Sequence, residues 1–252
     1  MSLIKNESEL AKIRHSGAIH REVMAKLKAG IKPGVTPKEL DTLAKRLIED
    51  AGAQPSFLGY QPTGATKQYP ATICASLNEV VVHGVPTDKP LQAGDVFSID
   101  MGVLYQGYHS DAAITVIVGG RADNKVHELL TVTKQALTLG IAAAQVGNTL
   151  GDIGSGIGSF CKEHGLAVIQ GLTGHGIGTE LHEDPYVFNE GQPDQGMKLE
   201  AGMVLAIEPM TSLGSPRITQ NKDEGYATVD NSLSAHFEHT IILTESGPQV
   251  IT

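Results

Sequence analysis

The feature that most constrains the fold of this 252-residue chain is an internal repeat. The tripeptide Gly34–Thr36, with the apolar residues and the glycine that follow it, recurs 113 residues later at Gly147–Thr149. The segment 91–100, LQAGDVFSID, recurs as LEAGMVLAIE at 199–208. Both of these segments read Leu-x-Ala-Gly-x-Val-x-x-Ile followed by an acid. Matches of this kind predict two related structural units that pack on each other.

A third matched pair makes chance an inadequate explanation of the repeat. His-x-x-Pro stands ahead of each copy of the longer segment, at His83 and at His182. Two common helix starts can resemble each other by chance, but three elements repeated in one order rarely do. Because no linker-like stretch separates the copies, we expect a single domain over 1–252, duplicated internally at roughly 1–120 and 121–252.

Capping residues and apolar spacing predict helices and strands in the same order in each half. Asn6 with Glu9, and Thr36 with Glu39, are capping boxes that begin two helices within the first 52 residues. The other expected elements are strands at 71–77 and 80–82, a hairpin of strands 96–104 and 110–118 with its turn at 105–108, a helix at 126–144, and further strands after about residue 165. This order predicts an α+β fold whose halves share one sheet.

The second-half counterpart of the second helix contains four glycines, Gly151, Gly154, Gly156 and Gly158. A glycine in a helix interior costs about 1 kcal/mol of stability relative to alanine. Two explanations are open. Either the backbone of a neighbouring segment lies directly against this helix, or the helix is poorly formed.

Composition excludes several classes of function. The net charge of −9 argues against duplex DNA or an anionic membrane as the main partner. No apolar run approaches the ~20 residues of a membrane-spanning helix. Two cysteines, Cys74 and Cys161, cannot form a disulfide framework, and residues 1–7 lack the pattern of an export signal. We therefore expect a cytoplasmic protein.

The duplication places acidic residues at equivalent positions. Asp100 and Glu208 end the two copies of the longer segment, and the strand that follows in each half contains Asp111 or Glu238. A single acid of this kind is usually a solvated edge residue or the partner of a cation. Four acids within apolar strands would instead repel one another and take up protons. A bound metal ion would relieve that repulsion.

His175 is a fifth candidate ligand, in the glycine-rich segment 174–178, GHGIG. The spacing lacks the Lys-Ser/Thr of a P-loop and the Gly-x-Gly-x-x-Gly of dinucleotide sites, so we discount phosphate binding. Four carboxylates and a neutral imidazole carry a charge that two divalent cations neutralise, and Mn, Fe, Co or Zn suits this donor set. Two such ions can share a bridging water, lower its pKa and polarise a carbonyl group.

The histidines of the two His-x-x-Pro segments are candidate catalytic residues. At the mouth of such a site, His83 and His182 could hydrogen-bond a substrate's carbonyl oxygen and amide nitrogen as a tetrahedral intermediate forms. The alternative is that each is a structural histidine of a capped loop.

Taken together, these motifs resemble the type I methionine aminopeptidases. The resemblance covers nearly the whole chain, in order and at family-like spacing. It is carried by 78–86 (NEVVVHGVP), 98–100 (SID), 110–111 (SD), 174–178 (GHGIG), 181–183 (LHE), 207–210 (IEPM) and 232–240 (SLSAHFEHT). It implies the pita-bread fold, in which two pseudo-twofold-related α/β halves form a curved, mostly antiparallel sheet covered by helices. It also implies removal of the initiator methionine from nascent chains whose second residue is small, by a short bacterial-type monomer with at most transient ribosome contact.

The resemblance assigns roles to the five candidate ligands. Asp111 and Glu238 would bridge both metal ions, Asp100 would hold one, and His175 with Glu208 would hold the other. Glu208 would also handle the proton of the attacking water. The two divalent ions would be Co, Mn, Fe, Zn or Ni.

The resemblance also implies two further sets of residues. His83 and His182 would assist catalysis, and a monovalent cation, Na⁺ or K⁺, would sit beside Asn78, Val80 and Ser234.

The implied methionine pocket departs from the family pattern. Tyr60, Tyr69 and Cys74 match the family, but about six extra residues lie within the Gly59–Pro70 loop, and Lys67 stands near the family's second-site histidine. Three pocket positions differ from the family. The family often has Cys at the position of Phe57, an aromatic residue at that of Leu181, and Trp at that of Tyr226. We therefore expect a methionine pocket of altered shape.

Two other readings of the motifs remain open. Prolidase and aminopeptidase P have the same fold and ligands but act before proline, and they normally carry an added N-terminal domain, for which this chain has no room ahead of its first helix cap. A non-catalytic binding protein on this fold would be expected to lose ligands, whereas all five are present here.

Overall fold

The computed structural model describes residues 2–61, 66–223 and 225–252. The helices are α1 (Glu7–Gly30), α2 (Pro37–Asp50), α3 (Asn124–Ala143) and α4 (Leu150–Glu163), with a short 3₁₀ turn at Val118–Gly120. First-half strands are β1 (Gln54–Pro55), β2 (Ile73–Leu77), β3 (Val80–Val82), β4 (Val96–Tyr105) and β5 (Tyr108–Ile117). Second-half strands are β6 (Ala167–Val168), β7 (Gly174–Gly176), β8 (Glu183–Val187), β9 (Val204–Ile207), β10 (Met210–Ser212), β11 (Ile218–Gln220), β12 (Tyr226–Thr228), β13 (Ser234–His236), β14 (His239–Thr244) and β15 (Gly247–Val250).

The predicted helix starts are confirmed. The Asn6 side chain accepts from the backbone N–H of Glu9 at 3.1 Å, and the Glu9 carboxylate accepts from the N–H of Asn6 at 2.8 Å. Thr36 and Glu39 form the same reciprocal cap at the start of α2. Each cap satisfies two N–H groups that have no partner within the helix, which fixes where the helix begins.

The longest strands form the predicted hairpin. β4 and β5 pair in continuous register from Val96 opposite Ile117 to Tyr105 opposite Tyr108. The two-residue turn between them, Gln106–Gly107, has φ values of 48° and 81°. Positive φ at both positions is typical of the type I′ turn, whose twist matches that of the flanking strands.

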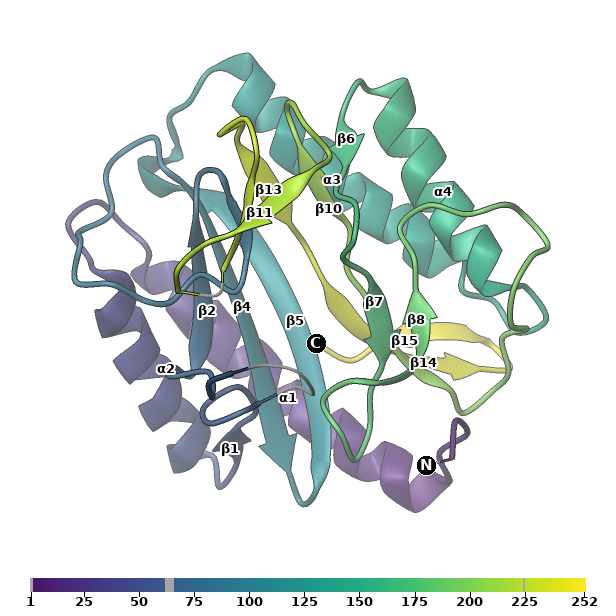
Figure 1. Ribbon diagram of the computed structural model, residues 1–252. Helices are drawn as coiled ribbons and strands as arrows, with labels where there is room; N and C mark the ends of the chain where they lie inside the picture. The colour runs from purple at the N-terminus through teal and green to yellow at the C-terminus, as the bar shows by residue number, and fades with distance from the viewer. Residues whose placement is uncertain (1, 62–65, 224) are drawn as a thin grey trace.

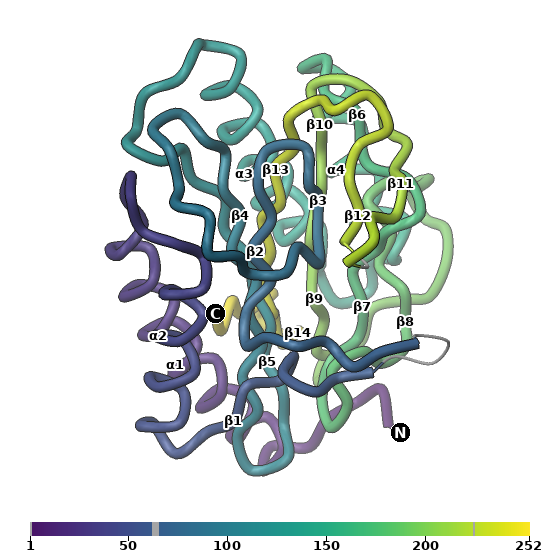
Figure 2. The backbone as a smooth tube through the Cα atoms, turned by 60° about the vertical axis from the view of Figure 1, so that its left-hand side comes forward, coloured from purple at the N-terminus to yellow at the C-terminus, as the bar shows by residue number. Residues whose placement is uncertain are grey.

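The expected α+β class is confirmed, with strand pairings that are antiparallel throughout the described residues. The strands do not form the single hydrogen-bonded sheet expected of the two halves but four sheets: β1-β4-β2 with β5 beside β4, β13-β10-β6, β11-β12-β3, and β15-β14-β9-β7-β8. In Figure 1, α1 and α2 lie beside the first-half strands, and α3 and α4 lie beside the second-half strands. Each helix pair covers its own apolar core, and Figure 2 shows the same separation from a second direction.

Threonine side chains connect the two halves where a regular strand ladder would otherwise run. Thr115 of β5 donates its hydroxyl to the carbonyl of His236 at 2.7 Å and accepts from the N–H of His236 at 2.9 Å. Thr240 of β14 makes the same pair of bonds with the backbone of Asp111, at 2.7 and 2.8 Å. We call these bonds the threonine seam. Because the seam brings β5 beside residues 236–240, it places the acids of the two halves close together.

The segment around Glu238 is not the continuous strand that its alternation predicts. β13 ends at His236, β14 begins at His239, and the two strands belong to different sheets. The chain crosses between sheets at Phe237 and Glu238, where the N–H of Glu238 donates to the carbonyl of Ala113 at 3.0 Å. Both side chains are buried. Glu238 is thus held at the junction of the two halves.

The glycine-rich helix α4 is well formed, and close backbone contact accounts for most of its glycines. A Cβ atom at Gly154 would lie 2.7 Å from the carbonyl oxygen of Phe188, and one at Gly158 would lie 3.0 Å from that of Asn189. Gly151 is similarly close to the backbone of Gln192. At Gly156 the nearest such atom is 3.8 Å away, which is an ordinary contact. Within the described residues, the helices are too short or too polar to cross a bilayer.

Candidate active site and metal centre

Asp100 and Asp111 reach one side of the β4–β5 hairpin because of its register. Gly102 lies opposite Asp111, and Asp100 lies two residues before Gly102 on the same strand. Residues two apart, and residues directly opposite each other, point to the same face of an antiparallel pair. Both carboxylates are buried, Asp100 at 9% and Asp111 at 3% exposure.

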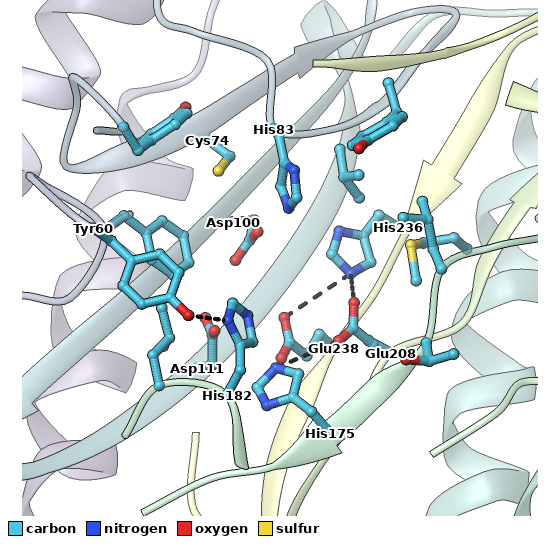
Figure 3. Close-up of a pocket in the computed structure, with 18 of the residues that line it drawn as sticks. Tyr60, Cys74, His83, Asp100, Asp111, His175, His182, Glu208, His236 and Glu238 are labelled. Atoms are coloured by element: carbon cyan, nitrogen blue, oxygen red, sulfur yellow. Dashed lines mark hydrogen bonds and ion pairs between the residues drawn. The ribbon is translucent and has the colours of Figure 1, made fainter. Parts of the chain in front are cut away.

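The second half contributes its acids from strand ends. Glu208 directly follows β9. His175 lies on the neighbouring strand β7, where it pairs with Ala206 of β9. The Nε2 atom of His175 is 3.6 Å from Oε1 of Glu208. The Nε2 atom of His236 is 3.4 Å from Oε2 of Glu208 and 3.9 Å from Oε2 of Glu238 (Figure 3). The duplication therefore brings the four predicted acids and His175 into one cluster, because their strands meet at the threonine seam.

Burial raises the pKa values of all four carboxyl groups, and neighbouring carboxylates raise three of them further. Burial raises the pKa of Asp100 to about 6 and that of Glu208 to about 7. The pKa values of Asp111 and Glu238 are raised further, first by burial and then by the neighbouring carboxylates, Asp100 for the former and Asp111 for the latter. Without a cation, these groups would hold protons near neutral pH.

The unpaired atoms of this cluster fit divalent metal ions. Oδ1 of Asp100, Oδ1 of Asp111, Oε1 of Glu238 and Nε2 of His236 are buried without a hydrogen-bond partner. A buried polar atom without a partner costs free energy, so native proteins rarely retain one without a ligand or water. Two groups have ligand atoms within 4.8 Å of one another: Asp111, His175 and Glu238, and Glu208, His236 and Glu238. Carboxylate oxygens with imidazole nitrogens suit Mn, Fe, Co or Zn.

Sequence reasoning did not include His236 among the site residues, although it lies in this cluster. The available signal was a histidine two residues before the acid in each half, His109 before Asp111 and His236 before Glu238. Only one of the pair reaches the carboxylates, since Nδ1 of His109 is 2.9 Å from the hydroxyl of Ser56. Burial lowers the pKa of His236, so its ring is neutral and able to share a proton or a metal ion.

His83 and His182 lie at the same cluster, as Figure 3 shows. The ring of His182 is 4.4 Å from the ring of His175, centre to centre, and its Nδ1 atom is 2.7 Å from the Tyr60 hydroxyl. Both side chains are exposed to the cavity, where partial loss of hydration lowers the pKa of His83 to about 4 and, together with His175, lowers that of His182 to about 3. Both rings are therefore neutral at pH 7, each with one N–H donor and one acceptor.

An apolar recess adjoins the cluster and contains most of the predicted methionine-pocket residues. Phe57, Cys74 and Leu181 are buried in one group, against which Tyr60 and Tyr69 pack. These residues line a cavity of about 1630 Å³ that also contains the carboxylates, His83 and His182. Burial raises the pKa of the Cys74 thiol, which keeps it protonated.

Tyr226 does not belong to this apolar group, and part of the Gly59–Pro70 loop lies outside the residues that the structure describes. Tyr226 borders the cavity from a different apolar group, with its ring centre 5.8 Å from that of His83. Lys67 also borders the cavity. Residues 62–65 of the Gly59–Pro70 loop lie outside the described residues, so the predicted effect of that insertion stays a prediction.

The predicted monovalent-cation residues also lie together. The Ser234 hydroxyl is 3.1 Å from the carbonyl oxygen of Asn78 and 3.1 Å from that of Val80. The three oxygens come from strands and turns of both halves. The hydroxyl donates hydrogen bonds to the two carbonyl groups, and binding of Na⁺ or K⁺ here stays a prediction.

Comparison with known proteins shows the family to which this chain belongs. The model of metallopeptidase family M24 matches residues 11–245, and the chain belongs to that family. A protein of Clostridium perfringens named methionine aminopeptidase is 42% identical over 254 residues, covering 100% of this chain and 99% of that protein. The crystal structure of a methionine aminopeptidase from Thermotoga maritima superposes with a TM-score of 0.94 at 39% identity, covering 99% of this chain and 98% of the other.

Proline-specific relatives match less fully. A prolidase from Pyrococcus furiosus has a TM-score of 0.79 at 25% identity. The match covers 99% of this chain but 65% of the prolidase. The resemblance indicated by the sequence motifs is therefore confirmed at the level of the family, and the full-length matches favour the methionine aminopeptidase branch.

Proposed function

We propose that this chain is a metal-dependent methionine aminopeptidase, which removes the initiator methionine from nascent proteins and peptides whose second residue is small. The observation that carries the proposal is the cluster of four buried carboxylates and His175 beside an apolar recess. Apolar and aromatic side chains surround the recess, which suits an unbranched apolar side chain, and the cluster supplies ligands for the hydrolytic metal ions.

The proposed ligands are Asp100, Asp111, His175, Glu208 and Glu238, with Asp111 and Glu238 shared between two divalent ions. Co, Mn, Fe, Zn and Ni are the candidate ions. When bound, such ions lower the pKa of water and polarise a carbonyl group. The unpaired buried oxygens of this cluster support the assignment.

Three residues of the chain are proposed to handle protons and the peptide bond. Glu208, placed beside the proposed metal ions, suits a group that takes a proton from water and returns it to the leaving amine. Neutral His83 and His182 can donate hydrogen bonds to the substrate's carbonyl oxygen or accept one from its amide N–H. The Tyr60 hydroxyl, 2.7 Å from His182, orients that ring.

The remaining residues are proposed to bind the substrate and a structural cation. Phe57, Tyr60, Tyr69, Cys74, Leu181 and Tyr226 would surround the methionine side chain. Na⁺ or K⁺ would bind at Asn78, Val80 and Ser234. We further propose one duplicated catalytic domain over 1–252, in line with the two apolar cores, and that it acts as a cytoplasmic monomer that contacts the ribosome transiently.

The first test is a metal-titrated assay with Met-Ala-Ser. Chelator-treated protein should release methionine when Mn²⁺, Co²⁺ or Fe²⁺ is restored, and Glu208→Gln should lower kcat about 10²- to 10⁴-fold. Glu200→Gln, which changes an exposed acid, is the matched control and should leave kcat unchanged. Release of methionine by Glu208→Gln without metal, or faster cleavage of X-Pro peptides than of Met-Ala-Ser, would refute the proposal.

A further inference from the structure

The cavity at the carboxylate cluster extends well beyond the methionine recess. Its lining runs from the buried side chains of Phe57 and Cys74, past His182, to Tyr186 and Phe188 on the molecular surface. The volume of about 1630 Å³ exceeds the roughly 300–1,000 Å³ of ordinary small-molecule sites. There is room for several residues of a peptide.

The open end of the cavity has an apolar side. Tyr186, Phe188 and Met197 are 64%, 57% and 40% exposed, and all three line the cavity. We call these three residues the β8 shelf. Elsewhere the outer lining includes polar side chains at 67–68 and 220–223. Large apolar side chains gathered on a surface usually mark a binding site, since exposing them to water is unfavourable.

The shelf is aligned with an extended chain that leaves the catalytic cluster. β8 directly follows His182 and is the edge strand of its sheet, which is visible at one side of Figure 2. Pro185 and Val187 are buried, whereas Tyr186 and the following Phe188 face outward. Side chains on one face of a strand recur every two residues, about 6.6–6.8 Å apart. The ring centres of Tyr186 and Phe188 are 6.4 Å apart, which matches alternate residues of an extended peptide.

The backbone behind the shelf is fixed by the glycine-rich helix α4. The chain after β8 lies directly on this helix, because Gly154 leaves space for the carbonyl of Phe188. At the other end of the segment, the N–H of Leu150 donates to the carbonyl of Met197 at 3.0 Å. The exposed rings therefore project from a held backbone, which lowers the entropic cost of binding a ligand.

We propose that the β8 shelf binds apolar side chains of the substrate peptide beyond its second residue, at positions 3 and 5. The inference rests on the proposed function, since the roles of His182 and the carboxylates locate the peptide bond that is cleaved. With methionine in the buried recess and that bond beside His182, the rest of the peptide leaves through the open end along β8. Peptides with apolar residues at positions 3 and 5 are then better substrates than polar ones.

The test compares kcat/KM for three substrates: Met-Ala, Met-Ala-Ser-Ser-Ser and Met-Ala-Leu-Ser-Leu. We expect the wild type to favour the leucine-containing pentapeptide over the serine one about tenfold, mainly through KM, because two leucine side chains are partly buried. The double variant Tyr186→Ala/Phe188→Ala should reduce that ratio to about one. Tyr186→Phe and Phe188→Leu keep an apolar surface and should retain the preference.

Leu139→Ala is the matched control, because Leu139 is 40% exposed on α3 and lies away from the cavity. It should keep the wild-type ratio. Equal kcat/KM for the two pentapeptides in the wild type, or a loss in the double variant that is the same for all three substrates, would overturn the shelf proposal. Failure of the wild type to release methionine from any of the three substrates would instead count against the proposed function.

Discussion

His20 of α1 is the buried side chain whose surroundings most clearly oppose a charge. It is 1% exposed, and neither ring nitrogen has a hydrogen-bond partner. Burial lowers its pKa from 6.5 to about 3, with smaller contributions from His239 and Arg21. The folded protein therefore holds this ring neutral, whereas the unfolded chain takes up a proton below pH 6.5.

This difference in the pKa of His20 between the folded and unfolded states predicts that acid lowers the stability of the protein. As the pH falls from 6.5 toward 3, the unfolded state binds the proton and the folded state does not, so stability is lost at about 1.4 kcal/mol per pH unit. Between pH 7 and pH 5 His20 should contribute a loss of about 2 kcal/mol. Urea unfolding at the two pH values should show that His20→Leu loses about 2 kcal/mol less than the wild type. Equal losses in the two proteins would contradict this account.

At the residue scale, the sequence predicted which acids cluster better than it predicted the residues around them. Asp100 and Glu208, and Asp111 and Glu238, could be found because duplication places equivalent residues at equivalent strand positions. His109 and His236 share the same spacing to an acid, yet only His236 reaches Glu208, since the chain crosses between sheets after β13. No local pattern contains that crossing. The unpartnered position of His20 likewise depends on what packs around α1.

Among the elements, α4 is the one whose composition conflicts with its structure. Four glycines lower its intrinsic helix propensity, but three of them allow the segment after β8 to contact the helix backbone. The sequence indicated a helix and raised close approach as one explanation. The sequence could not show which of the four glycines lie against another backbone, because the contacting segment begins some 30 residues further along the chain.

The contacts predict opposite effects of two alanine substitutions. Gly154→Ala should destabilise the protein by about 1–3 kcal/mol, because the new Cβ would lie 2.7 Å from the carbonyl oxygen of Phe188. Gly156→Ala should stabilise it by up to about 1 kcal/mol, because its nearest neighbour is 3.8 Å away and helix propensity improves. Urea unfolding of both variants measures the two effects. A stabilised Gly154→Ala protein would show that the contact is not tight.

A buried ion pair connects the N-terminal segment to the loop that contains His182. Nζ of Lys5 is 2.6 Å from Oε2 of Glu183, and the two side chains are 4% and 6% exposed. The same lysine donates to the carbonyl of Ser2 at 2.7 Å. Removing one partner would leave a buried charge uncompensated, which is the costly way to break such a pair.

Lys5→Met should therefore lower stability by about 3–5 kcal/mol, whereas Lys5→Met combined with Glu183→Gln should recover part of that loss. The double-mutant cycle by urea unfolding measures the coupling. Lys38→Met is the control, since its ion pair with Asp88 is exposed and should be worth less than about 1 kcal/mol. Strictly additive losses at Lys5 and Glu183 would argue against coupling.

For the whole molecule, the carboxylate cluster makes stability depend on metal. Four buried acids from both halves repel one another, and cations that bind the folded state alone stabilise it by mass action. Overall, the sequence predicted this architecture well, since the repeat, the caps and the hairpin turn are local signals. It did not predict the division into four sheets, which depends on contacts such as those of Thr115 and Thr240.

Removal of metal should lower the thermal midpoint. Mn²⁺ at 100 times its Kd contributes about 2.7 kcal/mol. For a chain of this size that corresponds to roughly 5–10 °C in Tm, readable by differential scanning calorimetry with and without chelator. Asp111→Asn, which weakens a shared ligand, should show a much smaller shift. Identical Tm values for the loaded and chelated wild type would contradict the proposed centre.

The threonine seam has a consequence for when activity can appear during biosynthesis. Its bonds join Asp111 to Thr240, and Thr115 to His236, across more than 120 residues. A ribosome releases Asp100 and Asp111 long before Glu238, so a growing chain cannot assemble the proposed centre from its first half. Contacts this distant in sequence also form slowly. Each new molecule can therefore gain the proposed centre only in a late step, after the segment that contains Glu238 has been made.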